Sequence, residues 1–438
     1  MVERAAEGVS LREGQAIYPA VCDLNGTWRG KRYPAHQATK LEKTAMRLPL
    51  SILAVDIWGR DVLDNPIFVD AGDPDAPFVS TGRGPVVSSR GEAAESMLFP
   101  MWCLDDDGRP HPLDPRGSLS GIARELRSRG LQAGIGTELE FYLVSRKDQF
   151  TTFPASNTLG IVELERFEPF LCEVERDCSL NGIEAEASVS EGGRGQFEVV
   201  LRYSDDILGA ADDFAILKYI VRRAAGAHGY EACFMAKPFA GEPGNGFHTH
   251  VGLKNAAGEN IFLGGLEDEA SKLRHAVGGL LRALPQSMLV FAPHFNSYRR
   301  FFENSLAPTR ASWGLENRTT AIRIADAAGA NIRIEHRVAG ADANPYLVIG
   351  AVLLGILAGL DRKVDPGDPV EGSAYSSAAD RLPDTWNEAI RAFSDSTPLG
   401  PLYDPVLHSS FLAAKRQELS FFTDHVSDLE RSTYGALV

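Results

Sequence analysis

Ionisable side chains recur at alternate positions in four segments that the sequence predicts to be strands. Side chains two residues apart in a strand point to the same face, so each segment gathers its charges on one side. These residues are Glu138 and Glu140 in 135–143, Glu198 in 196–202, His248 and His250 in 247–251, and Arg333, Glu335 and Arg337 in 332–338. Glu191 precedes Glu198 across a Gly-Gly-Arg-Gly turn. The pattern predicts a site that concentrates charge.

The residue types in these segments favour one kind of ligand. Carboxylates with an imidazole suit Mg²⁺ or Mn²⁺ better than zinc, and arginines grip phosphate oxygens with two hydrogen bonds. Any one segment alone is more simply a solvated strand face, but the four together predict a metal–nucleotide site. The usual phosphate-binding glycine loops are missing, because the glycines at 241–246 have the wrong spacing and precede a strand.

The elements around these segments indicate an α+β protein of two domains. Short strands and turns fill residues 1–110, and strands alternate with long helices through 111–438. Helices are predicted at 118–129, at 207–228 with Gly229 as its stop, and at about 408–434. The apolar run 347–360 reads as a buried helix capped by Asn344, with Pro345 in its first turn. Residues 365–381 read as an exposed loop.

Composition excludes several functions. The net charge of −15 argues against a nucleic-acid surface. The run 347–360 is shorter than the roughly eighteen residues that span a bilayer, so no membrane partner is expected. Five scattered cysteines and an N-terminus without the features of a signal peptide predict a reduced, cytoplasmic protein.

Longer motifs in the chain resemble those of glutamine synthetases, and they occur in the same order. They are Glu138-x-Glu140, Gly195-Gln-Phe-Glu198, Lys237-Pro-Phe-Ala-Gly241, Gly246-Phe-His-Thr-His250, Asn296-Ser-Tyr-Arg-Arg300, Trp313-Gly-Leu-Glu-Asn-Arg318, Arg333-Ile-Glu335 and Ala343-Asn-Pro-Tyr346. The resemblance implies an N-terminal β-grasp domain, a catalytic domain with a curved antiparallel sheet flanked by helices, and homo-oligomers of stacked hexameric rings, commonly dodecamers, with active sites between subunits.

The resemblance also implies roles for individual residues. Glu140, Glu191 and Glu198 match the ligands of one metal, and Glu138, His248 and Glu335 match those of a second metal beside ATP. Arg318, Arg323 and Arg333 match the arginines around the transferred phosphate, and His250 and Tyr203 match nucleotide contacts. Arg300, Arg337 and Gly244 match the binding site of glutamate. The implied reaction makes γ-glutamyl phosphate from glutamate and ATP with Mg²⁺ or Mn²⁺, and an amine then displaces the phosphate.

Two departures from that family concern the amine. Leu306 stands where glutamine synthetases have a flap glutamate, and the ammonium-binding aspartate has Asp56, in Val55-Asp-Ile-Trp-Gly59, as its nearest match. A leucine cannot take a proton but can contact carbon, as can Trp58. The pattern resembles the γ-glutamylpolyamine synthetase branch and predicts an organic amine as acceptor. A glutamine synthetase using ammonia and a catalytically silent relative are the alternatives, and Leu306 could also serve flap packing alone.

Overall fold

Two β-sheets, one after the other along the chain, organise the molecule in the computed structural model. The structure describes residues 16–90, 96–145, 158–266, 268, 271–395 and 403–438. The first sheet is built from β1 (Ala16–Cys22), β2 (Trp28–Gly30), β3 (Tyr33–Pro34), β4 (Met46–Pro49), β5 (Asp75–Ser80) and β6 (Ser96–Cys103). Its order is β2-β1-β6-β5-β4, with β3 also on β1, and β1 runs parallel to β6. Two short helices, α1 (Ala38–Lys43) and α2 (Pro66–Val69), complete this part.

The second sheet carries the charged strands. Its strands are β7 (Gln132–Ser145), β8 (Ala185–Ser190), β9 (Gln196–Ser204), β10 (Tyr230–Cys233), β11 (Phe247–Lys254), β12 (Trp313–Leu315), β13 (Ile322–Ala325) and β14 (Arg333–His336). The order is β12-β13-β14-β11-β7-β9-β8, with β10 also on β7. The expected α+β fold is confirmed. The sheet is antiparallel except at its edge, where β12 runs parallel to β13.

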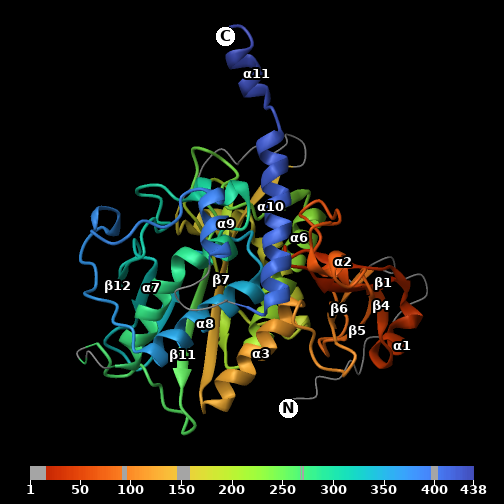
Figure 1. Cartoon of the computed structure of the whole chain (residues 1–438), viewed down its shortest axis with the longest axis horizontal. Coiled ribbons are helices and arrows are strands. Elements are labelled where there is room, and N and C mark those ends of the chain that lie inside the picture. Colours follow the sequence, from red (N-terminus) through yellow and green to blue (C-terminus); the bar gives the residue numbers. More distant parts are fainter. Residues whose placement is uncertain (1–15, 91–95, 146–157, 267, 269–270, 396–402) are drawn as a thin grey trace.

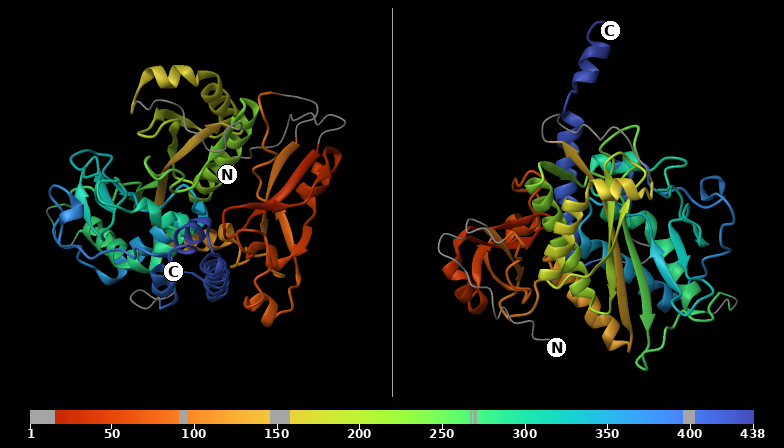
Figure 2. Two further views of the ribbon diagram at one scale, coloured as in Figure 1. Left: turned by 90° about the horizontal axis from the view of Figure 1, so that it is seen from above. Right: turned by 180° about the vertical axis from the view of Figure 1, so that it is seen from behind.

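Helices cover the apolar face of this sheet (Figures 1 and 2). The longest is α6 (Ile207–Ala227), and its Phe214 stacks on Phe247 of β11 with the ring centroids 3.8 Å apart. Phe247 pairs with Leu139, so α6 lies on the face opposite Glu138 and Glu140. The predicted stop is confirmed: α6 ends before Gly229, whose φ is +82°. The charged face therefore stays open to ligands.

Further helices lie in the second part of the chain. They are α3 (Pro115–Ser128), α4 (Ile161–Arg166), α5 (Glu168–Leu180), α7 (Lys272–Phe291), α8 (Pro345–Arg362) and α9 (Trp386–Ser394), with the 3₁₀ helix η3 (Phe295–Arg300). Asn344 caps α8 with Pro345 at its start, as predicted. The helix has 18 residues, so the expectation that its apolar run is too short to cross a membrane was wrong on length. Most of it is buried inside the protein, against α7 and α3, as a core helix.

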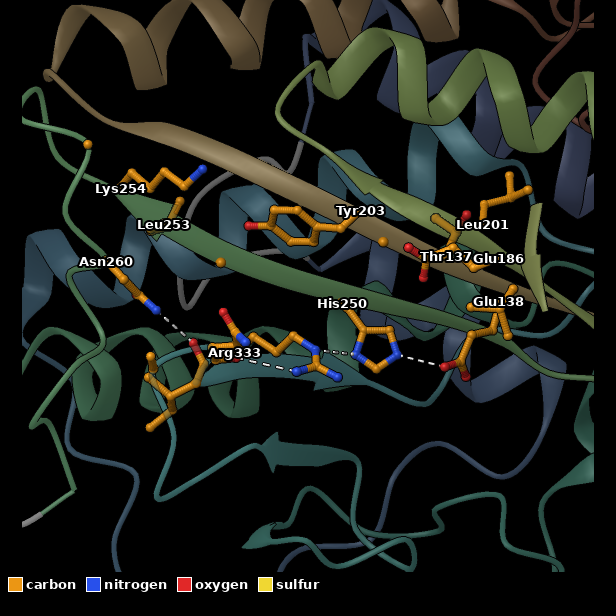
Figure 3. A pocket seen from close by; sticks show the side chains of 17 residues that line it. Thr137, Glu138, Glu186, Leu201, Tyr203, His250, Leu253, Lys254, Asn260 and Arg333 are labelled. Carbon is orange, nitrogen blue, oxygen red and sulfur yellow. Dashed lines mark hydrogen bonds and ion pairs between the residues drawn. The ribbon is translucent and has the colours of Figure 1, made fainter. Parts of the chain in front are cut away.

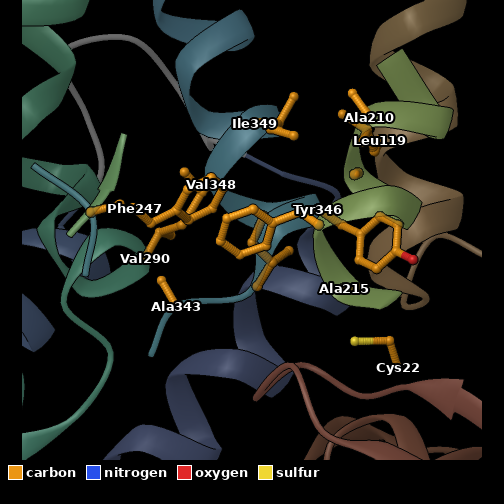
Figure 4. Packing of buried hydrophobic residues seen from close by; sticks show 14 of the residues in the cluster. Cys22, Leu119, Ala210, Ala215, Phe247, Val290, Ala343, Tyr346, Val348 and Ile349 are labelled. Carbon is orange, nitrogen blue, oxygen red and sulfur yellow. The ribbon is translucent and has the colours of Figure 1, made fainter. Parts of the chain in front are cut away.

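The hydrophobic core runs without a break from the first sheet into the helices (Figure 4). Cys22 at the end of β1 lies beside Tyr346 of α8 and Ala215 of α6. The Asn344 side chain donates to the carbonyl of Asp23 at 2.8 Å. The start of α8 is therefore attached to the turn that follows β1.

The C-terminal helix differs from the prediction. The expected single helix at about 408–434 is two helices, α10 (Pro405–Asp424) and α11 (Asp428–Tyr434). Ser427 starts α11 with a capping box, in which it bonds the Glu430 backbone and Glu430 bonds it in return. α11 extends away from the body of the molecule (Figure 1).

Candidate active site

Strand register places the charged residues in neighbouring rows on one face. His248 of β11 lies opposite Glu138 of β7, and Glu140 lies opposite Glu198 of β9. On the other side of β11, His250 lies opposite Glu335 of β14. Because all of these strands are adjacent in the sheet, side chains from distant parts of the sequence meet.

Two overlapping groups in this cluster have the geometry of metal sites. Ligand atoms of Glu138, His248 and Glu335 lie within 4.8 Å of one another, and so do those of Glu140, Glu198 and His248. The first group is the set that the resemblance implies. In the second, His248 stands where Glu191 was expected. Glu191 follows β8 directly and is half-buried beside these groups.

Electrostatics in the cluster favour a cation. Burial, together with Glu138, Glu140 and Glu191, raises the pKa of Glu198 to about 9. Burial and Glu140 also raise the pKa of Glu191. Burial likewise opposes ionisation of Glu138, but hydrogen bonds with His248 and His250, at 2.9 and 2.8 Å, outweigh it and hold the pKa of Glu138 below its usual value. Carboxylates crowded with too little counter-charge fit divalent cations, which prefer oxygen ligands.

The arginines lie along the same face and are paired to different extents. Arg323 donates to Glu335 at 2.6 Å, and Arg337 donates to the other oxygen of Glu335. Burial opposes ionisation of Glu335, but the charge of Arg337, with His248 and His250, outweighs it and lowers the pKa of Glu335 to about 2. The Nε atoms of Arg323 and Arg337 are buried without a hydrogen-bond partner in the described part of the chain, so they remain for an anionic ligand. Arg318 is exposed in the turn after β12.

A cavity of about 520 Å³ opens beside the cluster (Figure 3). Glu138, His250, Arg333 and Tyr203 line it. Arg333 Nε lies 3.3 Å from His250 Nδ1, and His250 Nε2 in turn bonds Glu138. The residues expected to contact the nucleotide therefore line one cavity next to the proposed metal ligands.

Two glycines allow Arg300, which is expected to bind glutamate, to lie close to the backbone of the 244–246 segment. Arg300 is buried, and it donates to the carbonyls of Val338 and Arg337 at 2.8 and 3.4 Å. A Cβ on Gly244 would lie 2.7 Å from the Arg300 side chain. A Cβ on Gly246 would lie 2.8 Å from His248 Nε2 and 2.9 Å from an Arg300 nitrogen. Sequence reasoning did not select Gly246, although its place two residues before His248 was a signal.

The residues predicted on the amine side are not assembled with the cluster within one chain. Asp56 is buried, and its carboxylate accepts from the backbone of Trp58, the backbone and side chain of Arg60, and Gln417. Burial opposes these bonds, but they lower the pKa of Asp56. The 56–60 loop is thus organised by Asp56, and Trp58 packs on Phe421 of α10. Neither Asp56 nor Trp58 lines the cavity of Figure 3.

The flap, loop 301–306, is largely exposed and carries apolar as well as polar side chains. Leu306 is 54% exposed with a φ of +60°, and Phe302 is also exposed. Ser305 Oγ donates to the Phe302 carbonyl at 2.6 Å and holds the turn. Glu303 is an exposed carboxylate in the same loop, which sequence reasoning also missed. Its position three residues before Leu306 was the available signal.

Comparisons with known proteins agree with this geometry. Residues 112–434 match the family model described as glutamine synthetase, catalytic domain. The gamma-glutamylputrescine synthetase PuuA of Escherichia coli is 35% identical, over 95% of this chain and 90% of its own length. A glutamine synthetase of Pyrococcus abyssi is 34% identical, over 92% and 90%. A solved GmaS/ADP complex superposes with a TM-score of 0.82 at 26% identity, covering 96% of this chain and 97% of its own.

The match over most of the chain, the ADP-bound structural relative and the cluster of glutamates and histidines lead to one conclusion. This chain belongs to the glutamine synthetase family.

Proposed function

We propose that the chain is an ATP-dependent ligase that joins the γ-carboxylate of glutamate to an organic amine, through γ-glutamyl phosphate. An organic amine as the acceptor is supported mainly by the flap, where the side chains of Leu306 and Phe302 expose carbon surface. The likeness to a gamma-glutamylputrescine synthetase supports the same class. A polyamine or a small alkyl or aromatic amine fits this surface.

The residues divide the work of the reaction. Glu138, His248 and Glu335 would hold one divalent cation, and Glu140 and Glu198, with Glu191, a second. Such cations neutralise charge on a transferring phosphoryl group. Arg318, Arg323 and Arg333 would bind the phosphate oxygens, and His250 and Tyr203 would contact the nucleotide. Arg300, Arg337 and Gly244 would position glutamate, so that its γ-carboxylate oxygen attacks the γ-phosphorus and ADP leaves.

In the second step the amine nitrogen attacks the acyl carbon, and phosphate leaves. The attacking amine must lose a proton. Asp56 is the nearest match to the ammonium-binding aspartate, but its carboxylate already accepts four hydrogen bonds. Glu303 is an exposed carboxylate on the flap itself, and we propose that Glu303 rather than Asp56 accepts the proton of the amine. We further propose that the chain forms homo-oligomers in the cytoplasm.

The test is phosphate release with ATP, Mg²⁺ and glutamate across ammonia, methylamine, ethanolamine, putrescine, spermine and aromatic amines. Two or three carbons buried on Leu306 and Trp58, at about 0.8 kcal/mol each, give roughly ten- to fifty-fold preference over ammonia. Leu306→Glu should narrow that gap, and Leu306→Met, which keeps the carbon surface, should preserve it. Ammonia as the best acceptor of the unmodified enzyme would overturn the proposal.

Glutamine synthesis from ammonia is the second candidate, because Glu303 offers a flap carboxylate that could bind ammonium. The variant Glu303→Gln distinguishes an organic amine from ammonia as the acceptor. If ammonia is the acceptor, the variant should lose ammonium affinity. If an alkylamine is the acceptor, its KM should change little while kcat falls, because carbon contacts supply the binding.

A further inference from the structure

A second cavity, of about 390 Å³, lies where the first domain meets the helical side of the second. Its walls come from the turn after β1, from α6, from the end of β10 and from the segments around η3 and Asp342. It shares no lining residue with the cavity beside Tyr203. No residue assigned above to metal, nucleotide, glutamate or amine lines it.

One wall of this cavity carries two cations. Lys218 and Arg222 lie one turn apart on α6, with their charged groups 5.2 and 4.9 Å from the ring of Phe234. Lys218 is buried and donates to the Ala341 carbonyl at 2.8 Å. Within the described ranges, neither cation has a carboxylate within ion-pair distance. Like charges at this spacing repel each other, so this wall favours an anion.

The segment that follows β14 supplies the opposite charge. Asp342 accepts from Ser297 Oγ at 2.6 Å through one carboxylate oxygen. Its other oxygen, Oδ1, is buried with no partner among the residues that the structure describes. A buried acceptor left unpaired costs about 1–3 kcal/mol, which a donor from a guest would offset. The cavity thus lacks an anion on one wall and a donor on another.

We propose that this cavity binds a small zwitterion, an amino acid whose α-carboxylate contacts Lys218 and Arg222 and whose α-ammonium donates to Asp342. The cavity is large enough to admit a molecule of that size. Ser297, the partner of Asp342, lies in η3 one turn before Arg300. The guest therefore contacts, through Asp342, the segment that carries Arg300. This site goes beyond the proposed function.

Binding of L-alanine to the full chain tests the site, measured by saturation-transfer NMR and calorimetry. Propionate and L-alaninamide are the probes that lack one charge each. We expect alanine to bind at least ten-fold more tightly than either. Arg222→Gln should weaken alanine binding at least ten-fold, whereas Arg223→Gln, at the next position of α6, should not. Glu335→Ala, which removes a proposed metal ligand, should leave alanine binding unchanged, so failure of the ligase proposal would not affect this result.

A second measurement reports on Lys218 directly. Burial and Arg222 lower its pKa to about 7. Reductive ¹³C-methylation makes this pKa visible by NMR, with Lys218→Arg identifying the signal. A carboxylate beside the ammonium favours the charged form, so alanine should raise the pKa of Lys218. Absence of alanine binding up to about 50 mM, propionate binding as tightly as alanine, or unchanged affinity in Arg222→Gln would each overturn the proposal.

Discussion

At the residue scale, Glu335 connects the proposed metal ligands with the arginines. It lies within ligand distance of Glu138 and His248 and is paired with Arg323 and Arg337. We expect Glu335→Ala or His248→Ala to abolish nearly all phosphate release. Either variant removes a ligand of the cation, and without the cation the remaining carboxylates have too little counter-charge. Both variants should also lose most of the rise in Tm that Mg²⁺ or Mn²⁺ gives the unmodified enzyme.

The control for that prediction is Glu259→Ala. Glu259 is an exposed carboxylate that bonds Asn255 in the turn after β11, and it belongs to neither group of candidate metal ligands. Its metal-dependent Tm and its activity should match those of the unmodified enzyme. A Glu335→Ala enzyme that kept near-full activity would show that the ligand assignment is wrong.

Arg300 gives a prediction about substrate rather than metal. Its guanidinium is buried, and two backbone carbonyls fix it. Arg300→Lys keeps the charge but loses the planar fork that pairs with a carboxylate. The KM for glutamate should rise about ten-fold or more, with the KM for ATP changed far less, as initial rates will show. A larger change for ATP would place Arg300 on the nucleotide side.

At the element scale, glycines in β7 and β11 make room for Tyr203. A Cβ on Gly134 would lie 2.2 Å from the Tyr203 ring, and one on Gly252 would lie 2.5 Å from its hydroxyl. The ring therefore lies over backbone that carries no side chains. Gly252 is not among the glycines with a positive φ, so an alanine there would not strain the backbone. The substitution therefore tests only the contact between the added Cβ and Tyr203.

We expect Gly252→Ala to displace the Tyr203 ring within the cavity and raise the KM for ATP about ten-fold. The KM for glutamate should change much less, since Tyr203 is not among the residues proposed to bind glutamate. Gly121→Ala is the matched control, because only an Arg124 nitrogen at 3.9 Å lies near its added Cβ. Equal changes in both constants would mean that the substitution acts on the whole sheet.

At the scale of the whole molecule, the 56–60 loop stands apart from the cluster of its own chain. Asp56 shapes this loop, and α10 supports it through Gln417 and through Glu418, which accepts from the Ile57 backbone at 2.8 Å. Trp58 keeps 42% of its surface exposed. An exposed aromatic on a rigid loop suits a contact with a second copy of the chain.

This arrangement predicts complementation. Asp56→Ala and Glu335→Ala should each be nearly inactive alone, the first by loosening the loop and the second by losing a metal ligand. Hybrids formed by co-expression should recover activity, because a normal loop from one copy meets a normal cluster from the other. Native mass spectrometry will confirm the hybrids. Confirmed hybrids without activity would show that each chain builds its site alone.

Several properties could be predicted from the sequence because their causes are local. Alternation of charge in 135–143 and 247–251 predicted shared faces, since the strand repeat is two residues. Asn344 with Pro345 predicted the start of α8, and Gly229 the end of α6, because caps act within one turn. The ordered motifs around Glu138, His248 and Arg333 predicted the family. The departure at Leu306 predicted the acceptor class, which remains a proposal.

Other properties depend on pairings between residues far apart in the chain, which a local pattern does not specify. The opposition of Glu140 to Glu198 follows from the register of β7 and β9, and the parallel pairing of β12 with β13 from the path of the chain at the sheet edge. The four hydrogen bonds of Asp56 include one from α10, 361 residues away in sequence. The cations of α6 line one cavity together with Asp342, which lies more than a hundred residues further along the chain. Periodicity thus determined the face of the sheet to which each side chain points. Tertiary packing decided which residue lies opposite it on the neighbouring strand, because long-range register is set by the whole buried core.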